Sequence, residues 1–375
     1  MAETFLLSSL VIPGTYVRVR AEGLIGAGPV STGNIGIVGT AQLLDDANAP
    51  VDIYGQTYTL GGYEDSKARL GRYDAFDGGN GTLNLNRGVE LLYAGGARTI
   101  YARPLAPGAA LADYTAAFNE LGKENVNIFV APELPTADAL SVFGSVLETQ
   151  ENNQKDIIAV VGADATTPAT ITGQVADDRI ILAAPAIIAG ETFEQGGATT
   201  SGRVTLQGRY TAAVIAGLLS TLAPQFSPTN KQVRGILGLS QRFSYSETID
   251  LINGGVLVIE ERLGFRVVRG VSSENATNGP FRQITTRRIV DAAKAGIRQA
   301  SNPFIGRLNN QRVRAALRGA IDGFLTSMVQ DEALIGYTLE VTATRDDEIN
   351  GRAIVNVILQ PTFSIDFIAV TLVLE

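Results

Sequence analysis

The sequence predicts a mixed α/β protein with more than one domain. At 375 residues the chain is too long for one ordinary hydrophobic core. Its middle part alternates apolar strand-like runs with helical patterns, which is typical of an α/β layer. Both ends carry strand-forming residues, whereas the ends of most domains are polar and frayed. We therefore expect an α/β core, a small β-rich insertion, a second α+β domain and extended β-strand arms at both termini.

The N-terminal part begins with an arm that we place at residues 1–22. A turn at Pro13-Gly14 precedes the run at 15–20, whose alternating residues favour a strand. The first residues contain Glu3 and no basic side chain, which is unlike a signal peptide, so we expect a cytoplasmic origin.

Residues 23–250 carry the α/β pattern. We expect a glycine-rich loop at 23–33 and an irregular or small β insertion at about 45–82. The patterns predict strands at 34–41, 98–103, 127–130, 156–162 and 179–184, and helices at 83–93, 113–122, 137–152 and 210–222. Continuous apolar runs are typical of strands buried on both faces of a parallel sheet. The pair Gly95-Gly96 has the form of a helix C-cap.

We place the second domain at residues 251–361. The runs at 256–260 and 265–269 suit a hairpin about Leu263-Gly264. The pattern then predicts helices at about 285–300 and 311–330, a strand at 337–344 and a polar turn at 345–350.

The end of the chain consists of two strand-forming runs separated by Pro361. The second run, Phe367–Glu375, alternates apolar residues and stops at the last residue of the sequence. Its backbone donors and acceptors need a neighbour. That neighbour is either a strand of the same domain or a sheet shared with another subunit, by strand addition.

Two residue types are missing from the sequence. There is no Cys, so disulfides, thiolate nucleophiles and zinc–thiolate sites are excluded. There is no His, so a Ser-His-Asp triad is excluded, and the usual general base is missing. The sequence contains no run of about 18 apolar residues, so we expect no membrane span. We expect no catalytic residue, cofactor or metal, and a structural role.

Charge is distributed unevenly along the chain. Residues 1–200 contain 11 basic and 23 acidic residues, whereas residues 201–375 contain 19 basic and 15 acidic residues. The stretch 262–318 holds 12 basic residues opposed only by Glu274 and Asp291. Arg314 and Arg318 are four residues apart on the predicted helix, and Arg307 would share their face if that helix began early. This asymmetry predicts a surface that meets an acidic partner.

Several segments, taken in order, carry a family resemblance. They are PGTYV at 13–17, LNRGVELLYAGGARTIYARP at 85–104, the Leu-x-Asn-Gly-Gly-Val and GFRVVRG runs within 251–270, the run at 284–307, EALIGY at 332–337 and QPTFSIDFIAVTLVLE at 360–375. Together they resemble the contractile tail sheath proteins of phages, R-type pyocins and related injection machines. The sequence departs from the family after Gly270, where Val-Ser-Ser replaces the common Arg-Thr-Leu, and at Asp366, where Glu is usual.

The resemblance implies a mechanical role in a virion tail or injection particle assembled in the cytoplasm of a bacterial host. It implies hexameric rings stacked helically around an inner tail tube protein, with baseplate and tail terminator proteins as further partners. The 251–361 domain would face the tube, and the arms at 1–22 and 362–375 would pair with a neighbour's sheet. We expect tube contacts at Arg307, Arg312, Arg314 and Arg318, and inter-subunit strand contacts at Thr15, Tyr16, Val17, Val19, Phe367, Ile368, Val370, Leu372 and Leu374.

Two alternatives come from other functional classes. A nucleic-acid-binding protein would use the basic 262–318 stretch, but the chain has a net charge of −8 and that stretch lacks interleaved aromatic residues. A carboxylate-dependent hydrolase on the α/β layer is the other alternative. No G-x-G-x-x-G follows a predicted strand, and there is no P-loop.

Overall fold

The computed structural model describes residues 32–73, 83–195, 198–275 and 279–373, and the N-terminal arm lies outside them. The chain forms two compact units. The large unit comprises Ser31–Ala292 together with Pro361–Glu375, and the small unit contains Ala293–Gln360. The chain passes from the large to the small unit within helix α8 (Ile284–Ser301) and returns at Pro361.

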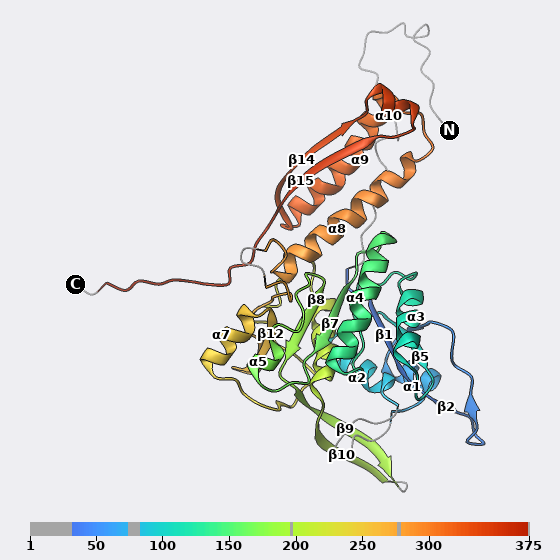
Figure 1. Cartoon of the computed structure of the whole chain (residues 1–375), viewed down its shortest axis with the longest axis vertical. Coiled ribbons are helices and arrows are strands. Elements are labelled where there is room, and N and C mark those ends of the chain that lie inside the picture. Colours follow the sequence, from blue (N-terminus) through green and yellow to red (C-terminus); the bar gives the residue numbers. More distant parts are fainter. Residues whose placement is uncertain (1–31, 74–82, 196–197, 276–278, 374–375) are drawn as a thin grey trace, which may run out of the picture. The chain divides into compact units, whose positions relative to one another are not determined.

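An eight-stranded sheet organises the large unit (Figure 1). Its strands, in spatial order, are β13 (Phe265–Val267), β12 (Val256–Glu261), β8 (Ile180–Ala184), β7 (Ile158–Gly162), β6 (Ile128–Val130), β1 (Ile35–Thr40), β5 (Ile100–Leu105) and β4 (Tyr58–Leu60). The six central strands from β12 to β5 are parallel, and the edge strands β4 and β13 are antiparallel to their neighbours. The expected α/β core is therefore present.

Helices cover both faces of this sheet, as its parallel strands require. They are α2 (Leu85–Gly95), α3 (Leu111–Leu121), α4 (Thr136–Asn152) and α6 (Thr211–Thr221). Successive strand residues point to opposite faces. In β6, for example, Ile128 and Val130 join the core with α2 and α6, whereas Phe129 joins the core with α3 and α4. This explains why the strands are continuously apolar instead of alternating.

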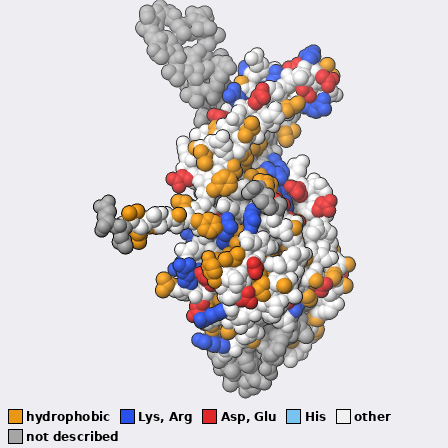
Figure 2. Space-filling model, turned by 60° about the vertical axis from the view of Figure 1, so that its left-hand side comes forward, with side chains coloured by type: hydrophobic (Ala, Val, Ile, Leu, Met, Phe, Trp, Pro, Cys, Tyr) orange, Lys and Arg blue, Asp and Glu red, His pale blue; other side chains and the backbone are white. Residues whose placement is uncertain are grey.

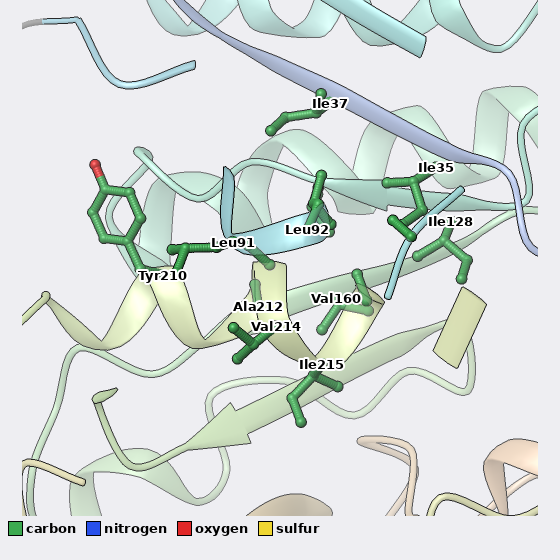
Figure 3. Packing of buried hydrophobic residues seen from close by; sticks show 14 of the residues in the cluster. Ile35, Ile37, Leu91, Leu92, Ile128, Val160, Tyr210, Ala212, Val214 and Ile215 are labelled. Atoms are coloured by element: carbon green, nitrogen blue, oxygen red, sulfur yellow. The ribbon is translucent and has the colours of Figure 1, made fainter. Parts of the chain in front are cut away.

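Helices α2 and α6 pack with their backbones unusually close. A Cβ atom on Gly95 would lie 2.9 Å from the Val214 carbonyl oxygen, and one on Gly217 would lie 2.7 Å from that of Leu92. Figure 3 shows Leu91 and Leu92 of α2 beside Ala212, Val214 and Ile215 of α6, together with strand residues of the sheet. Gly96 ends α2 in the left-handed conformation, φ 111°, which confirms the expected C-cap.

The remaining elements of the large unit are smaller. Those in the insertion are β2 (Leu43–Leu44), β3 (Pro50–Val51), β4 and helix α1 (Tyr63–Leu70), so its last strand joins the main sheet. A hairpin of β9 (Ile187–Gln195) and β10 (Ala198–Thr205) pairs with β11 (Gly238–Leu239). The sequence patterns missed this hairpin. Short helices complete the unit: α5 (Pro168–Ile171), η3 (Gly208–Tyr210) and α7 (Tyr245–Asn253).

The small unit consists of helices beside a two-stranded sheet. After α8 come η4 (Asn302–Phe304), α9 (Gln311–Gln330), β14 (Leu334–Thr342), α10 (Arg345–Ile349) and β15 (Ile354–Pro361). A Cβ atom on Gly296 of α8 would lie 1.9 Å from the ring of Phe324 on α9, so the close approach of the two helices requires glycine there. The β14–β15 sheet packs against α9 (Figure 1).

Two local expectations differ from the structure. The predicted polar turn at 345–350 is a short helix, because Thr344 caps it: the Thr344 hydroxyl accepts a hydrogen bond from the Asp347 amide, and the Asp347 carboxylate accepts one from the Thr344 amide. Helix α9 begins at Gln311, capped by Asn310, so Arg307 precedes the helix and does not share its face.

The hairpin turn predicted about Leu263-Gly264 is confirmed: it connects β12 and β13, with Leu263 at φ 50° and Gly264 at φ 94°.

Candidate assembly surfaces

The C-terminal arm, residues 362–373, is the most exposed apolar segment of the described chain. It belongs to no strand or helix. Exposure reaches 77% at Phe367, 83% at Ile368, 73% at Val370 and 86% at Leu372. Figure 2 shows hydrophobic side chains along this segment. Of the two readings left open by the sequence, pairing with a strand of the same chain does not occur in the described residues.

One residue of the arm is anchored. The Arg269 Nε atom donates a hydrogen bond of 2.9 Å to the Asp366 carboxylate, and the Ser364 hydroxyl donates another of 3.0 Å. Side-chain exposure is only 7% for Asp366 and 23% for Arg269. The Arg269 guanidinium also lies 5.1 Å from the centre of the Phe367 ring.

The small unit presents sheet edges. In the described residues β14 and β15 pair only with each other, so each has an edge without a strand partner. Side chains of β15 alternate between exposed and half-buried positions, with Ile354 and Ile358 on the exposed face. Free sheet edges are templates for the addition of further strands.

The four arginines proposed for tube contact lie in different environments. Arg314 is half-buried and donates hydrogen bonds of 2.9 Å to Asn309 and 3.0 Å to Glu348. Arg312 and Arg318 are exposed on α9. Arg318 makes no hydrogen bond or ion pair with any described residue, so its charge is available to another molecule. Arg307 is exposed, with its guanidinium 5.2 Å from the centre of the Phe304 ring.

Two apolar residues that the sequence patterns did not single out flank Arg307. Ile305 is 79% exposed and Leu308 is 78% exposed. A shallow hollow of about 760 Å³ is lined by Arg307, Leu308 and the first residues of α9, including Arg312. The loop before α9 therefore combines exposed apolar and basic side chains, a composition common in protein interfaces.

Other basic residues of the 262–318 stretch are buried and make hydrogen bonds inside the large unit. Arg287 donates hydrogen bonds to Asp178 at 2.6 Å and Asp291 at 2.8 Å, and Arg179 pairs with Asp291 at 3.1 Å. Arg288 is buried and donates to the carbonyl oxygens of Thr32 and Leu222, and burial lowers its pKa to about 10. The basic stretch is therefore not one continuous surface.

Inter-subunit strand contacts were also predicted, but the positions in the N-terminal arm fall outside the described residues, as does Leu374. These are Thr15, Tyr16, Val17 and Val19. The candidates Phe367, Ile368, Val370 and Leu372 are described, and all are exposed.

The carboxyl ends of the parallel strands are the usual ligand position in such a sheet. Here Glu133 accepts hydrogen bonds of 2.9 Å from both the amide and the hydroxyl of Thr40, and Asp164 accepts from Arg209 at 3.2 Å. Burial raises the pKa of Glu133 to about 7, although the Thr40 hydrogen bonds and the Arg209 charge oppose that shift. These carboxylates are engaged in contacts that join β1, β6 and β7.

The described residues contain neither a metal-binding cluster nor a membrane-spanning helix. No group of three or more acidic side chains there is arranged to hold a metal ion. No helix in the same part of the chain is long and apolar enough to cross a membrane.

Two family models match consecutive segments of the chain. The family model described as the phage tail sheath protein central domain matches residues 108–273, and the one described as the phage tail sheath C-terminal domain matches residues 276–375. No curated protein sequence matches the chain.

Solved structures with similar folds include three sheath proteins. The contracted helical sheath of the anti-feeding prophage is 18% identical with a TM-score of 0.74, covering 98% of this chain and 100% of that chain. The contracted PVC sheath of an extracellular contractile injection system is 16% identical with a TM-score of 0.71, covering 98% of each chain. A sheath tail protein from Desulfitobacterium hafniense is 12% identical with a TM-score of 0.63, covering 93% of this chain and 100% of that chain.

These structural matches show that the fold is shared over nearly the whole chain. The two family matches extend over most of the sequence, in the order that the sequence resemblance had indicated. The chain therefore belongs to the phage tail sheath protein family, as a structural subunit of a contractile tail sheath.

Proposed function

We propose that this subunit polymerises into hexameric rings stacked helically around an inner tail tube, and that contraction of the lattice drives the tube through a bacterial envelope. The observation that carries the proposal is the C-terminal arm, whose apolar side chains lack cover in the single chain. Burial of one Val, Leu, Ile or Phe side chain stabilises a complex by about 1.5–3 kcal/mol. A neighbouring copy that covers the arm would therefore be a favourable partner.

Strand addition suits a lattice that has to change shape. Main-chain hydrogen bonds hold an added strand largely independently of its side chains. The receiving edge that we propose is the β14–β15 sheet of another copy, because both of its strands lack a second partner in the described residues. The N-terminal arm would add to the same shared sheet. In this way subunits stay linked while their bodies move apart.

The tube-facing surface that we propose lies on α9 and the loop before it, within the segment 251–361. Exposed ion pairs contribute only about 0–1 kcal/mol each, so repeated weak pairs to an acidic tube can be released when the sheath widens. Arg318 and Arg307 are exposed, and Ile305 and Leu308 add apolar area beside them.

The basic residues of α9 allow a direct test of the tube contact. Replacing Arg314 and Arg318 with Glu should reduce assembly on purified tubes. Because Arg314 pairs with Glu348, Arg314→Glu would also place two carboxylates together within the subunit. Arg318→Glu alone is therefore the sharper variant, and we expect weaker cosedimentation with tubes and unchanged self-assembly without them.

Arg234→Glu is the matched control for charge, since Arg234 is exposed, lies in the large unit and, like Arg318, makes no ion pair with a described residue. Equal tube assembly by wild type, Arg234→Glu and both α9 variants would refute the tube-contact assignment.

We also propose baseplate and tail terminator proteins as partners, with the subunit assembled in the bacterial cytoplasm as part of a tail or injection particle. Some of the similar solved structures are baseplate assemblies of the anti-feeding prophage, which supports a baseplate partner. We expect no enzymatic activity. Nucleic-acid binding is not favoured, because Arg287 and Arg288 of the basic stretch are buried. Electron microscopy of the purified protein tests the whole proposal: long hollow cylinders support it, and monodisperse monomers under all conditions contradict it.

A further inference from the structure

The exposure pattern around Asp366 is the reverse of the usual one. Ile365 is 82% exposed and Phe367 is 77% exposed, yet the Asp366 side chain between them is only 7% exposed. Apolar side chains normally seek burial, and a carboxylate is buried only where it is paired and hydrogen-bonded. The arm is therefore held at this point mainly by its acidic residue, with the exposed Phe367 ring beside the Arg269 guanidinium.

The groups that receive Asp366 form a built carboxylate site. Arg269 Nε donates to one carboxylate oxygen at 2.9 Å, and the hydroxyls of Ser364 and Thr229 donate to the other at 3.0 and 3.4 Å. Thr229 Oγ1 itself accepts hydrogen bonds from the Gly270 amide at 3.0 Å and from the Ser227 hydroxyl at 2.8 Å. Those two contacts leave the Thr229 hydroxyl hydrogen as the donor toward Asp366.

The site is fixed to the edge of the main sheet. The Asn230 amide donates to the Val267 carbonyl of β13 at 2.8 Å, and the Val267 amide donates to the Lys231 carbonyl at 3.1 Å. A Cβ atom on Gly270 would lie 2.6 Å from Pro228, so the two segments that carry the site are packed closely. Because both segments are tied to strands, the site keeps its shape independently of the arm.

We propose that Ser227, Thr229 and Arg269 form a carboxylate cradle for the chain's own Asp366, and that this latch fixes the point from which the C-terminal arm extends to a second copy of the chain. The inference rests on the proposed linking role of the arm. With the latch closed, only the residues after Asp366 remain free to search for the neighbour's sheet edge. The arm then starts at a defined position on the subunit, which lowers the entropic cost of joining the next copy.

The absence of Cys makes arm mobility directly measurable. Ala369→Cys, at an exposed arm position, gives a single site for a nitroxide spin label. The label's mobility is recorded on the full chain at concentrations below assembly, and cylinder formation is followed separately on unlabelled protein. The variants are Asp366→Asn, Arg269→Met and the two combined. The control is Arg242→Met, which removes an exposed ion pair to Glu261 on the same unit.

The latch predicts that each single variant increases the mobile fraction of the label and slows assembly by about tenfold, the factor that corresponds to the loss of one hydrogen bond to a charged group. The double variant should match the single variants, because either change opens the same contact. Arg242→Met should behave as wild type in both measurements.

Label mobility unchanged by both Asp366→Asn and Arg269→Met would overturn the latch. So would assembly at the wild-type rate in spite of a released arm. These outcomes differ from failure of the proposed function, in which wild-type protein itself forms no cylinders while the mobility measurement still reports on the latch. If one variant does not fold, the other carries the test, since the two remove opposite partners of the same contact.

Discussion

The central strands of the large unit and the C-terminal arm are built from the same residue types, with opposite results. Ile128, Phe129 and Val130 of β6 are 0% exposed, whereas Phe367, Ile368 and Val370 of the arm are 73–83% exposed. Strand β6 has a parallel neighbour on each side and a helical layer on each face. The arm has neither within the described chain.

This difference separates the residues that stabilise the subunit from those that link it to others. Apolar side chains that are already covered stabilise folding and contribute nothing further on assembly. Side chains exposed in the free subunit contribute only when a partner covers them. Substitutions in the two regions should therefore change different measurable quantities.

The largest change in stability is expected from truncation in the core. Phe143 of α4 is 0% exposed and lies 5.0 Å from Phe118, measured between ring centres. We expect Phe143→Ala to lower the free energy of unfolding by about 3–5 kcal/mol, because it removes buried surface and leaves a cavity. Chemical denaturation of the unassembled subunit measures this loss.

The matched variant in the arm is Phe363→Ala, at a phenylalanine that is 60% exposed. Surface substitutions of this kind change stability by about 0.5 kcal/mol or less. Equal losses at the two positions would contradict the division of roles between core and arm.

A smaller, pH-dependent effect is expected at Glu133. Burial raises its pKa from the ordinary 4.5 to about 7, so the folded subunit binds this proton more tightly than the unfolded chain does. Stability from this group is fully present below about pH 4.5 and is lost as the pH rises through 7. The shift corresponds to roughly 3 kcal/mol.

Glu133→Gln keeps an acceptor oxygen for Thr40 and stays neutral. The unfolding free energy of the wild type should fall between pH 5.5 and 8 as Glu133 ionises. The variant should not show this contribution to the fall, and it should be the more stable protein at pH 8. Glu124→Gln, at an exposed position, is the control. If the wild type and Glu133→Gln show parallel pH profiles, Glu133 does not titrate in this range.

The sequence predicted most helices and strands of the α/β core because their signals are local. Continuous apolar runs mark β6, β7 and β8, and Gly95-Gly96 marks the end of α2. The β9–β10 hairpin was missed, because its sequence is rich in Gly and Thr and lacks a clear apolar alternation. The place of β4 at the sheet edge depends on pairing with β5, about 40 residues later, which no local pattern reveals.

The candidate surfaces were predicted only in part, for the same reason. Position and composition marked the arm as a strand in need of a neighbour, but they left open whether that neighbour lies in the same domain. The sequence did not reveal the partners of the arginines, since Arg314 contacts Glu348 and Arg269 contacts Asp366, far along the chain. A count of charges along the sequence therefore described 262–318 as one basic surface, whereas folding directs Arg287 and Arg288 inward.

The most direct test of the account is deletion of residues 362–375. The truncated subunit should remain folded and soluble, with an unfolding free energy within about 2 kcal/mol of wild type, because it loses little beyond the hydrogen bonds to Asp366. Electron microscopy, under conditions in which wild type forms cylinders, should show no polymer. Cylinders formed by the truncated protein would show that the arm does not link the subunits.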